Sequence, residues 1–251
     1  MRVSRAYNAS MSIILFTDYG LSGPYVGLLK AVLQQQAPGI QVIDLMHDVP
    51  AFDAEAGAYL LARLEKRFGS EDVFLCVVDP GVGGDRKPLV MRADGKWYVG
   101  PDNGLLSVIA QRAMNFQIWE ITWRPEKLSG TFHGRDLFAP IAAEIARGEF
   151  PHCKLSQMNE LSVVLPLEAR RIIYVDHFGN CMSGMHAGSL QKNTMLELCG
   201  RKISHAGTYS EVPLGKLFWY ENSIGLLEVA VNSGSAADAL GVAVGAGLKV
   251  L

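Results

Sequence analysis

Residues 73–86 read VFLCVVDPGVGGDR, and this stretch decides the fold that we expect for the chain. Six apolar residues run without a break into Asp79, which is typical of a strand buried on both faces of a parallel sheet. Pro80 cannot continue the hydrogen-bond ladder, and the glycines after it tolerate backbone angles that other residues resist. Asp79 should therefore lie at the carboxyl end of a central strand, where open α/β sheets place their ligand crevices. Arg86 can fold back toward this carboxylate, although an isolated stretch of this kind also fits a tight turn with a surface ion pair.

The composition is that of a folded chain with a substantial core. The 251 residues can form one large domain, or one medium and one small domain. Hydrophobic residues make up 49% and charged residues 19%, which argues against disorder. The net charge of -2 offers no electrostatic reason to expect nucleic acid or an anionic membrane as a partner. No apolar run approaches the roughly 20 residues that a membrane helix needs.

The cysteines and the first residues both favour a cytoplasmic protein. The cysteines form no CxxC pair and are far apart, so neither a zinc site nor a disulfide framework is expected: Cys76, Cys153, Cys181 and Cys199. Such thiols fit a reducing cytoplasm. Residues Met1–Ser10 carry two arginines but no apolar region that ends in a cleavage site, so we interpret them as a loose extension and not as a signal peptide.

The first half of the chain alternates between strand and helix patterns. Strands are expected at 12–16, 40–45 and 73–78, and helices at 24–36 and 54–67, with Asp53 as the N-cap of the second helix. This βαβαβ order predicts a parallel sheet with right-handed crossovers. Asp18 then also lies just past a strand end. The elements expected next are a hairpin of 89–93 and 97–100, a helix at 105–112, a strand at 116–121 and a helix at 137–147.

His133 is the histidine with the best claim to chemistry. Single histidines are more often structural, which is our interpretation for His47, His152, His186 and His205. His133 differs because Gly134, Arg135 and Asp136 adjoin it, and because Asp136 as an N-cap would place it in a loop that faces the crevice. The loop 81–84 lacks the lysine and hydroxyl of a P-loop, so a nucleoside triphosphate is not favoured. Acids at the strand ends suggest a ligand with hydroxyls or a positive charge.

The pattern changes after about residue 150. Residues 151–169 lose the alternation and contain two prolines, so we place the domain boundary there. Short strands are expected beyond it, at 171–175, 195–199, 213–219 and 224–231. The expected fold class is thus α/β: an N-terminal domain (11–165) with a mostly parallel α/β sheet, followed by a small antiparallel, barrel-like β domain (170–251).

Two polar clusters in this second domain are suited to reading a purine. DHFGN at 176–180 combines a carboxylate, an aromatic face and a side-chain amide, and ENSIG at 221–225 opens a strand that ends in VNSG at 231–234. Either cluster alone is more often simple turn chemistry.

Seven motifs follow one another in order: TDYG (17–20), DLMHDV (44–49), VVDPGVGGDR (77–86), PDNG (101–104), TFHGRD (131–136), DHFGN (176–180) and NSIG with VAVNSG (222–234). Together they resemble the S-adenosyl-L-methionine (SAM) hydroxide adenosyltransferases, also called SAM hydrolases, which are related to the fluorinases and chlorinases. The resemblance covers nearly the whole chain. It implies SAM as the substrate without a further cofactor or metal, and a homotrimer whose site lies between the N-terminal domain of one subunit and the C-terminal domain of the next.

The resemblance also implies roles for individual residues. The Asp–Arg–His set that handles the attacking water falls on Asp79, Arg86 and His133. The binding residues that it implies are Asp18 for the ribose hydroxyls, Phe52 near the sugar and base, Asp176 and Ser223 at the methionine end, and Phe178, Asn180 and the backbone from Val231 to Ser233 at adenine. The chain departs from the family at Leu21-Ser22-Gly23, where an acid is frequent, and at Ile224, where the fluorinase-like relatives carry arginine.

The implied reaction is attack of water at the 5′ carbon of SAM, which gives adenosine and L-methionine. The sequence does not decide which of the three takes the proton: His133 has the most suitable ordinary pKa, whereas Asp79 beside Arg86 would stay ionised and could orient it. One alternative is a SAM-dependent halogenase, but those relatives have tyrosine at the position of Asp79 and a halide-binding serine at that of Gly134. The other is a non-catalytic regulator that binds adenosine or SAM on the same scaffold.

Overall fold

The apolar run forms an interior strand of the larger sheet. In the computed structural model, which describes residues 11–251, this strand is β3 (Val73–Val77), and all five of its residues are buried. It lies between β1 (Ser12–Thr17) and β5 (Lys96–Pro101) and runs parallel to both. The extension expected over Met1–Ser10 lies outside the described residues.

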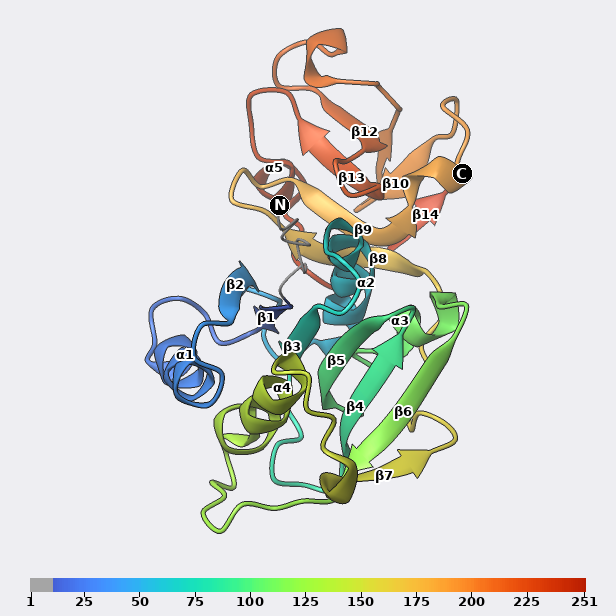
Figure 1. The fold of residues 1–251 in the computed structure, drawn as a ribbon. Coiled ribbons are helices and arrows are strands. Elements are labelled where there is room, and N and C mark those ends of the chain that lie inside the picture. Colours follow the sequence, from blue (N-terminus) through green and yellow to red (C-terminus); the bar gives the residue numbers. More distant parts are fainter. Residues whose placement is uncertain (1–10) are drawn as a thin grey trace, which may run out of the picture.

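Seven strands make up this sheet, in the order β2-β1-β3-β5-β4-β6-β7 (Figure 1). The remaining members are β2 (Gln41–Met46), β4 (Pro88–Ala93), β6 (Phe116–Ile121) and β7 (Leu155–Met158). β2, β1, β3 and β5 form the parallel part, whereas β4, β6 and β7 pair antiparallel. We expected no element in 151–169, so β7 corrects that prediction. Its sequence LSQM is short and largely polar, and only pairing with β6 makes it a strand.

Helices cover both faces of this sheet. α1 (Tyr25–Gln36) and α4 (Ala139–Ala146) share one core with Ile13 and Leu15 of β1. α2 (Ala54–Leu64) and α3 (Ser107–Arg112) share the other core with Ile14 and Phe16, because successive residues of a strand point to opposite faces. The longest helix in the described part of the chain, α1, has 12 residues, and none could span a membrane.

The two predicted helix caps have different outcomes. Asp53 caps α2 as predicted, because its carboxylate accepts a hydrogen bond from the Ala56 backbone N–H at 2.8 Å. The prediction for Asp136 is wrong. A π-helical turn at Gly134–Phe138 precedes α4, so Asp136 lies inside helical structure, and its carboxylate accepts from the Ser129 N–H at 2.9 Å instead.

The C-terminal part consists of two antiparallel sheets that share one core. The larger sheet has the order β12-β13-β9-β8, and the smaller one β11-β10-β14. Their bounds are β8 (Ala169–Val175), β9 (Cys181–His186), β10 (Leu196–Leu198), β11 (Arg201–Ile203), β12 (Leu217–Glu221), β13 (Leu226–Val231) and β14 (Leu248–Val250), and the short helix α5 (Ala236–Leu240) follows β13. The mixed α/β class with an antiparallel C-terminal part is confirmed.

Three strands of this part were missed, and one was placed too early. β9 (CMSGMH) lacks strict alternation, while β11 and β14 have only three residues each. The strand expected at 213–219 begins at Leu217, because residues 213–216 form a turn in which the Lys216 N–H donates to the Pro213 carbonyl.

The glycine loop after β3 depends on one close contact. Gly83 has φ +79°, and a Cβ placed on it would lie 2.4 Å from the Gly130 carbonyl oxygen. We expect Gly83→Ala to lower the free energy of unfolding by more than the ~1–2 kcal/mol that left-handed backbone alone costs an L-residue. Gly39→Ala is the matched control, because Gly39 has φ +84° and a Cβ placed on it would meet no atom within 4 Å. Equal losses for both variants in urea unfolding would contradict the contact.

Candidate functional site

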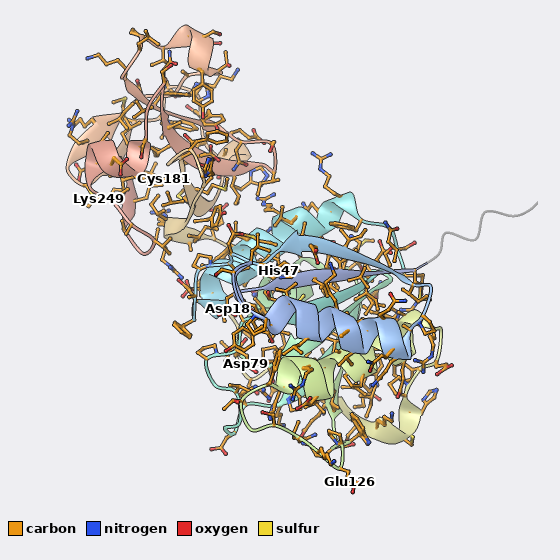
Figure 2. The ribbon with its side chains drawn as sticks, turned by 90° about the vertical axis from the view of Figure 1, so that its left-hand side faces the viewer. Asp18, His47, Asp79, Glu126, Cys181 and Lys249 are labelled. Carbon is orange, nitrogen blue, oxygen red and sulfur yellow. The ribbon has the colours of Figure 1, made fainter. Side chains whose placement is uncertain are left out.

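Two acids meet at the carboxyl edge of the parallel strands. Thr17 of β1 is paired with Val77 of β3, so Asp18 and Asp79 follow neighbouring strand ends. The Asp18 N–H donates to the Val77 carbonyl at 3.4 Å, and Figure 2 shows both acids on the same side of the N-terminal part. His47 lies nearby but is buried between Thr17 and Asp44, which agrees with a structural role.

Arg86 joins Asp79 to His133. Its Nε donates to Asp79 Oδ1 at 2.9 Å and its Nη2 to Asp79 Oδ2 at 2.5 Å, which is a bidentate pair. The same Nη2 donates to His133 Nδ1 at 2.8 Å. The guanidinium also lies over the Phe138 ring, 5.3 Å from its centroid. The loop after β3 therefore folds back, as the sequence predicted, and reaches the loop that carries His133.

The contact with Arg86 determines the protonation state of His133. A guanidinium has no acceptor, so Nδ1 must offer its lone pair, and the proton of the neutral ring is then on Nε2. Burial lowers the pKa of His133, and the positive charge of Arg86 lowers it further against the opposing effect of Asp79. His133 is therefore a neutral imidazole that presents an Nε2–H donor.

Asp18 is held by the backbone of Phe52. Its Oδ2 accepts from the Phe52 N–H at 3.1 Å. Phe52 has φ +65°, a strained conformation for a residue with a side chain, and 77% of its surface is exposed. Burial raises the pKa of Asp18, although the Phe52 N–H acts in the opposite direction.

These residues line a cleft of about 620 Å³, a size that suits a small molecule. Asp18, Phe52, Asp79 and His133 all line it, whereas Arg86 acts on it through Asp79 and His133. Three aromatic rings form part of the wall, with centroids 5.5–6.0 Å apart: Tyr19, Tyr25 and Phe132. The cleft thus combines charge at the strand ends with an apolar wall.

The Tyr19 hydroxyl fills the space in which a side chain on Gly134 would lie. A Cβ on Gly134 would lie 2.1 Å from the Tyr19 hydroxyl oxygen. Even a serine at this position would displace the tyrosine ring. We did not single out Tyr19 from the sequence, although its place next to Asp18 in TDYG is a signal that could have found it.

The other predicted site residues line two different cavities. Asp176, Phe178, Asn180 and Ser223 line one of about 600 Å³. Phe178 and Asn180 also line a second cavity of about 530 Å³, together with Val231 and Ser233. The structure therefore gathers the predicted residues into two sets, one at the N-terminal sheet edge and one of C-terminal residues, whose larger cavity is also lined by β2 and α2.

Asp176 organises its own turn. Its Oδ1 accepts from the backbone N–H of Phe178 at 2.9 Å and of Asn180 at 2.8 Å, and its Oδ2 accepts from Asn180 Nδ2 at 3.0 Å. Phe178 is 73% exposed at the tip of this turn. The carboxylate thus fixes the positions of the aromatic ring and the amide that the sequence analysis assigned to adenine.

A buried acid beside this turn was missed. Glu228 of β13 is only 2% exposed and accepts hydrogen bonds from the Tyr220 hydroxyl and from Asn222 Nδ2, the latter at 2.8 Å. Burial raises the pKa of Glu228, and the charge of Asp176 adds to this effect. A signal for it exists in the sequence, since Glu228 interrupts the apolar run of β13, and the structure shows that it lines the cavity of Asp176.

Similarity to known proteins agrees with the motifs. The family model for the SAM hydroxide adenosyltransferase N-terminal domain matches residues 13–154, and that for the C-terminal domain matches residues 170–249. The chain belongs to the SAM hydroxide adenosyltransferase family. The resemblance inferred from the seven motifs is therefore confirmed.

Individual relatives match this chain over nearly the full length of both proteins. A Thermus thermophilus protein named (R)-S-adenosyl-L-methionine hydrolase is 37% identical over 95% of this chain and 99% of its own. A fluorinase of Nocardia brasiliensis is 24% identical over 97% and 98%. The crystal structure of an uncharacterized conserved protein from Thermotoga maritima superposes with a TM-score of 0.87 at 32% identity, and covers 95% of this chain and 100% of that one.

No metal centre is formed within residues 11–251. Among these residues, no group of three or more histidine, cysteine or acidic side chains is arranged to hold a metal ion.

The state of His133 can be checked by NMR. Its imidazole should titrate below the ordinary value of about 6.5. Arg86→Met should raise this pKa, because a positive charge that disfavours the imidazolium is removed, and Asp79→Asn should lower it further. Arg92→Met, which removes an arginine paired with Glu71 elsewhere, should change nothing. A His133 pKa above 6.5, or a decrease in Arg86→Met, would contradict the assigned state.

Proposed function

We propose that this enzyme hydrolyses SAM to adenosine and L-methionine, by attack of water on the 5′ carbon. The observation that carries the proposal is the Asp79–Arg86–His133 network at a cleft of small-molecule size. Its full-length relatives named (R)-S-adenosyl-L-methionine hydrolase support the same reaction and point to the R form at sulfur.

The attacking water is the reactant that the enzyme must activate. The thioether leaves as a neutral group, so no acid is required, and the bond from the 5′ carbon to sulfur breaks with its electron pair going to sulfur. The new bond joins the water oxygen to that carbon. Catalysis therefore consists of orienting the water and removing its proton, for which positioning can supply about 7–11 kcal/mol and a base about 10²–10⁴-fold.

The hydrogen bonds favour Asp79 as the proton acceptor. The Nδ1 lone pair of His133 is engaged by Arg86, so this ring holds the water oxygen through its Nε2–H donor. The carboxylate of Asp79 lines the cleft and keeps lone pairs free beside those used by Arg86. The proton moves to Asp79 as the carbon–oxygen bond forms, and then to solvent.

The remaining residues are proposed to bind the substrate. Asp18 accepts from the ribose hydroxyls and Phe52 packs near the sugar. Asp176 and Ser223 meet the methionine end, where acidic and aromatic groups match the sulfonium charge. Phe178, Asn180 and the backbone from Val231 to Ser233 contact adenine.

We infer that the complete site forms between subunits of a homotrimer. The catalytic residues line one cleft, and the proposed adenine and methionine contacts line two other cavities, the larger of which also has residues of β2 and α2 in its wall. A head-to-tail contact that repeats and closes would bring one set against the other in a ring of three.

The four cysteines of the enzyme are free thiols, two of them exposed, which supports a reducing location such as the cytoplasm.

A halogenase activity is less compatible with the cleft. A desolvated halide would face the carboxylate of Asp79, and the Tyr19 hydroxyl fills the space that a side chain at position 134 would need. Turnover separates hydrolysis from the third possibility, a regulator that only binds SAM.

Replacement of the network residues should remove turnover more than binding. Asp79→Asn, Arg86→Met and His133→Ala are each expected to reduce adenosine formation by roughly 10²–10⁴-fold, because they act on water. SAM affinity by calorimetry should stay within about tenfold, a change worth ~1.4 kcal/mol.

Asp18→Ala is the contrasting variant and should weaken the binding of adenosine and of SAM alike, by ~1–3 kcal/mol. Equal loss of binding and turnover in all three network variants would make them substrate ligands, and formation of 5′-chloro-5′-deoxyadenosine in chloride would favour the halogenase.

The shared site predicts recovery of activity in mixed assemblies. His133→Ala chains and Asp176→Ala chains should each be nearly inactive. After dissociation and reassembly together, about one quarter of the interfaces should pair two intact faces, so activity should approach that fraction of the parent enzyme. A monomer in light scattering, or no recovery after confirmed subunit exchange, would rule the shared site out.

A further inference from the structure

A basic groove lies at the junction of the two parts of the chain, away from the catalytic cleft. It has a volume of about 600 Å³ and is lined by residues from the ends of α2 and α3 and from the segments around 167 and 186–189. α2 starts two residues after Phe52, whereas the groove residue Arg63 lies near its other end, roughly 13 Å further along the helix axis. The groove is therefore separate from the cleft of Asp18 and Asp79, and it shares no lining residue with the cavities of the C-terminal site residues.

Arg63 is the unusual member of this groove. Its residue surface is only 6% exposed, yet its buried Nε has no hydrogen-bond partner among residues 11–251. No carboxylate of the described residues forms an ion pair with it. A buried cation is unfavourable unless an anion and hydrogen-bond acceptors compensate for the lost water. Glu168 and Glu221 act on this side chain through their charges, but neither forms a hydrogen bond with its Nε.

A second unpartnered atom lines the same groove. His186 Nδ1 is buried without a hydrogen-bond partner in the described part of the chain. Its ring lies against Gly188, where a Cβ would be 2.6 Å from the imidazole Cε1. This differs from the satisfied structural role expected for His186. Two residues that line one groove therefore each carry a buried polar atom without a partner among the described residues.

Positive charge is in excess here. Lys66 and Arg112 also line the groove, and Arg112 donates to the Leu167 carbonyl at 2.9 Å, which is a neutral partner. The acid in the lining is Glu168, which already accepts from the His186 backbone N–H at 3.1 Å. Burial, followed by the charge of Arg112, lowers the pKa of Arg63, and the charges of Glu168 and Glu221 oppose this effect.

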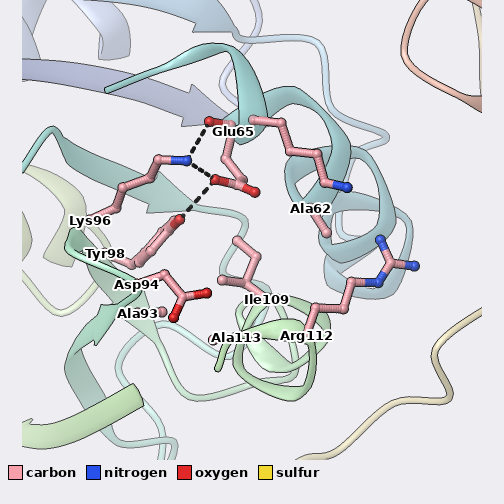
Figure 3. A pocket seen from close by; sticks show the side chains of 10 residues that line it. Ala62, Glu65, Ala93, Asp94, Lys96, Tyr98, Ile109, Arg112 and Ala113 are labelled. Atoms are coloured by element: carbon pink, nitrogen blue, oxygen red, sulfur yellow. Dashed lines mark hydrogen bonds and ion pairs between the residues drawn. The ribbon is translucent and has the colours of Figure 1, made fainter. Parts of the chain in front are cut away.

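The neighbouring pocket shares Lys66 and Arg112 with the groove, but its own cation Lys96 is paired. It has a volume of about 190 Å³, and Lys96 there is bound by the side chain and carbonyl of Glu65, with Tyr98 donating to the same carboxylate. Figure 3 shows the Arg112 guanidinium turned away from this pair. Glu65 is therefore hydrogen-bonded to Lys96 and Tyr98, and it acts on Arg112 only through its charge.

We propose that this groove binds a phosphoryl anion, either inorganic phosphate or a small phosphate monoester, held by Arg63, Arg112 and Lys66. The lining holds three cations and one acid, so a phosphoryl dianion would meet an excess of positive side chains there. Its tetrahedral oxygens accept from separate guanidinium groups, which is the recognition that arginine favours. His186 completes the site with a hydrogen bond from Nδ1. The site does not depend on the function proposed above.

The test measures phosphate binding to the full chain without an activity assay. Inorganic phosphate should bind saturably in calorimetry and raise the unfolding temperature, since a ligand of the native state stabilises it by mass action. Chloride and succinate at equal ionic strength should not. Glycerol phosphate distinguishes the two sources: tighter binding than phosphate assigns the site to an ester, and weaker binding assigns it to the free anion.

Arg63→Met tests the central ligand. It should weaken phosphate at least tenfold, because a charged hydrogen bond is lost. In phosphate-free buffer it should leave the unfolding temperature unchanged or raise it, since an unpaired buried charge is replaced by an apolar chain. Arg92→Met, at an exposed ion pair, is the matched control and should bind phosphate normally. If Arg63→Met does not fold, Arg112→Gln and Lys66→Gln give the same readout by phosphorus NMR.

Three results would overturn the site. These are no phosphate-specific stabilisation up to tens of millimolar, equal stabilisation by succinate, and unchanged phosphate affinity in Arg63→Met. A drop in unfolding temperature with unchanged affinity would show that Arg63 has a structural role only. If another subunit covers the groove, phosphate will give no stabilisation, which is the first of these results.

Discussion

The site depends on one guanidinium that must reach two loops at once. Arg86 binds Asp79 through two hydrogen bonds and His133 through a third, with both carboxylate and arginine side chains at most 10% exposed. Because the arginine can only donate, its position dictates the proton positions on the groups that it touches. A carboxylate that accepts and an imidazole that donates then face the same cleft, which is the combination needed to hold and deprotonate a water molecule.

The fold supplies the geometry for this contact. β3 is buried on both faces, so its end is a rigid starting point for the loop that follows. Asn103 donates to the Val78 carbonyl at 2.8 Å and secures the backbone just before Asp79. On the other side, the backbone of Gly83 packs directly against Gly130, which leads into the loop of His133. The two loops are therefore held together by main-chain contact as well as by Arg86.

Local sequence determined the elements and the strand-end acids. The unbroken apolar run required a buried strand, Asp53 could cap the helix that it precedes, and the acids after neighbouring strands had to share one edge. These features depend on residues close together in the chain. β7 was missed because a polar four-residue segment becomes a strand only beside β6. The role of Asp136 was decided by a π-helical turn that no capping pattern reveals.

Only the tertiary structure decided which groups touch. The protonation state of His133 follows from an arginine 47 positions away, and the buried state of Glu228 follows from Tyr220 on the neighbouring strand. The Nε of Arg63, which has no partner within residues 11–251, likewise becomes visible only when the segments around it are packed. Residue types and spacing state which chemistry a chain can perform. Hydrogen bonds and burial depend on distances between segments far apart in sequence, and packing alone sets those distances.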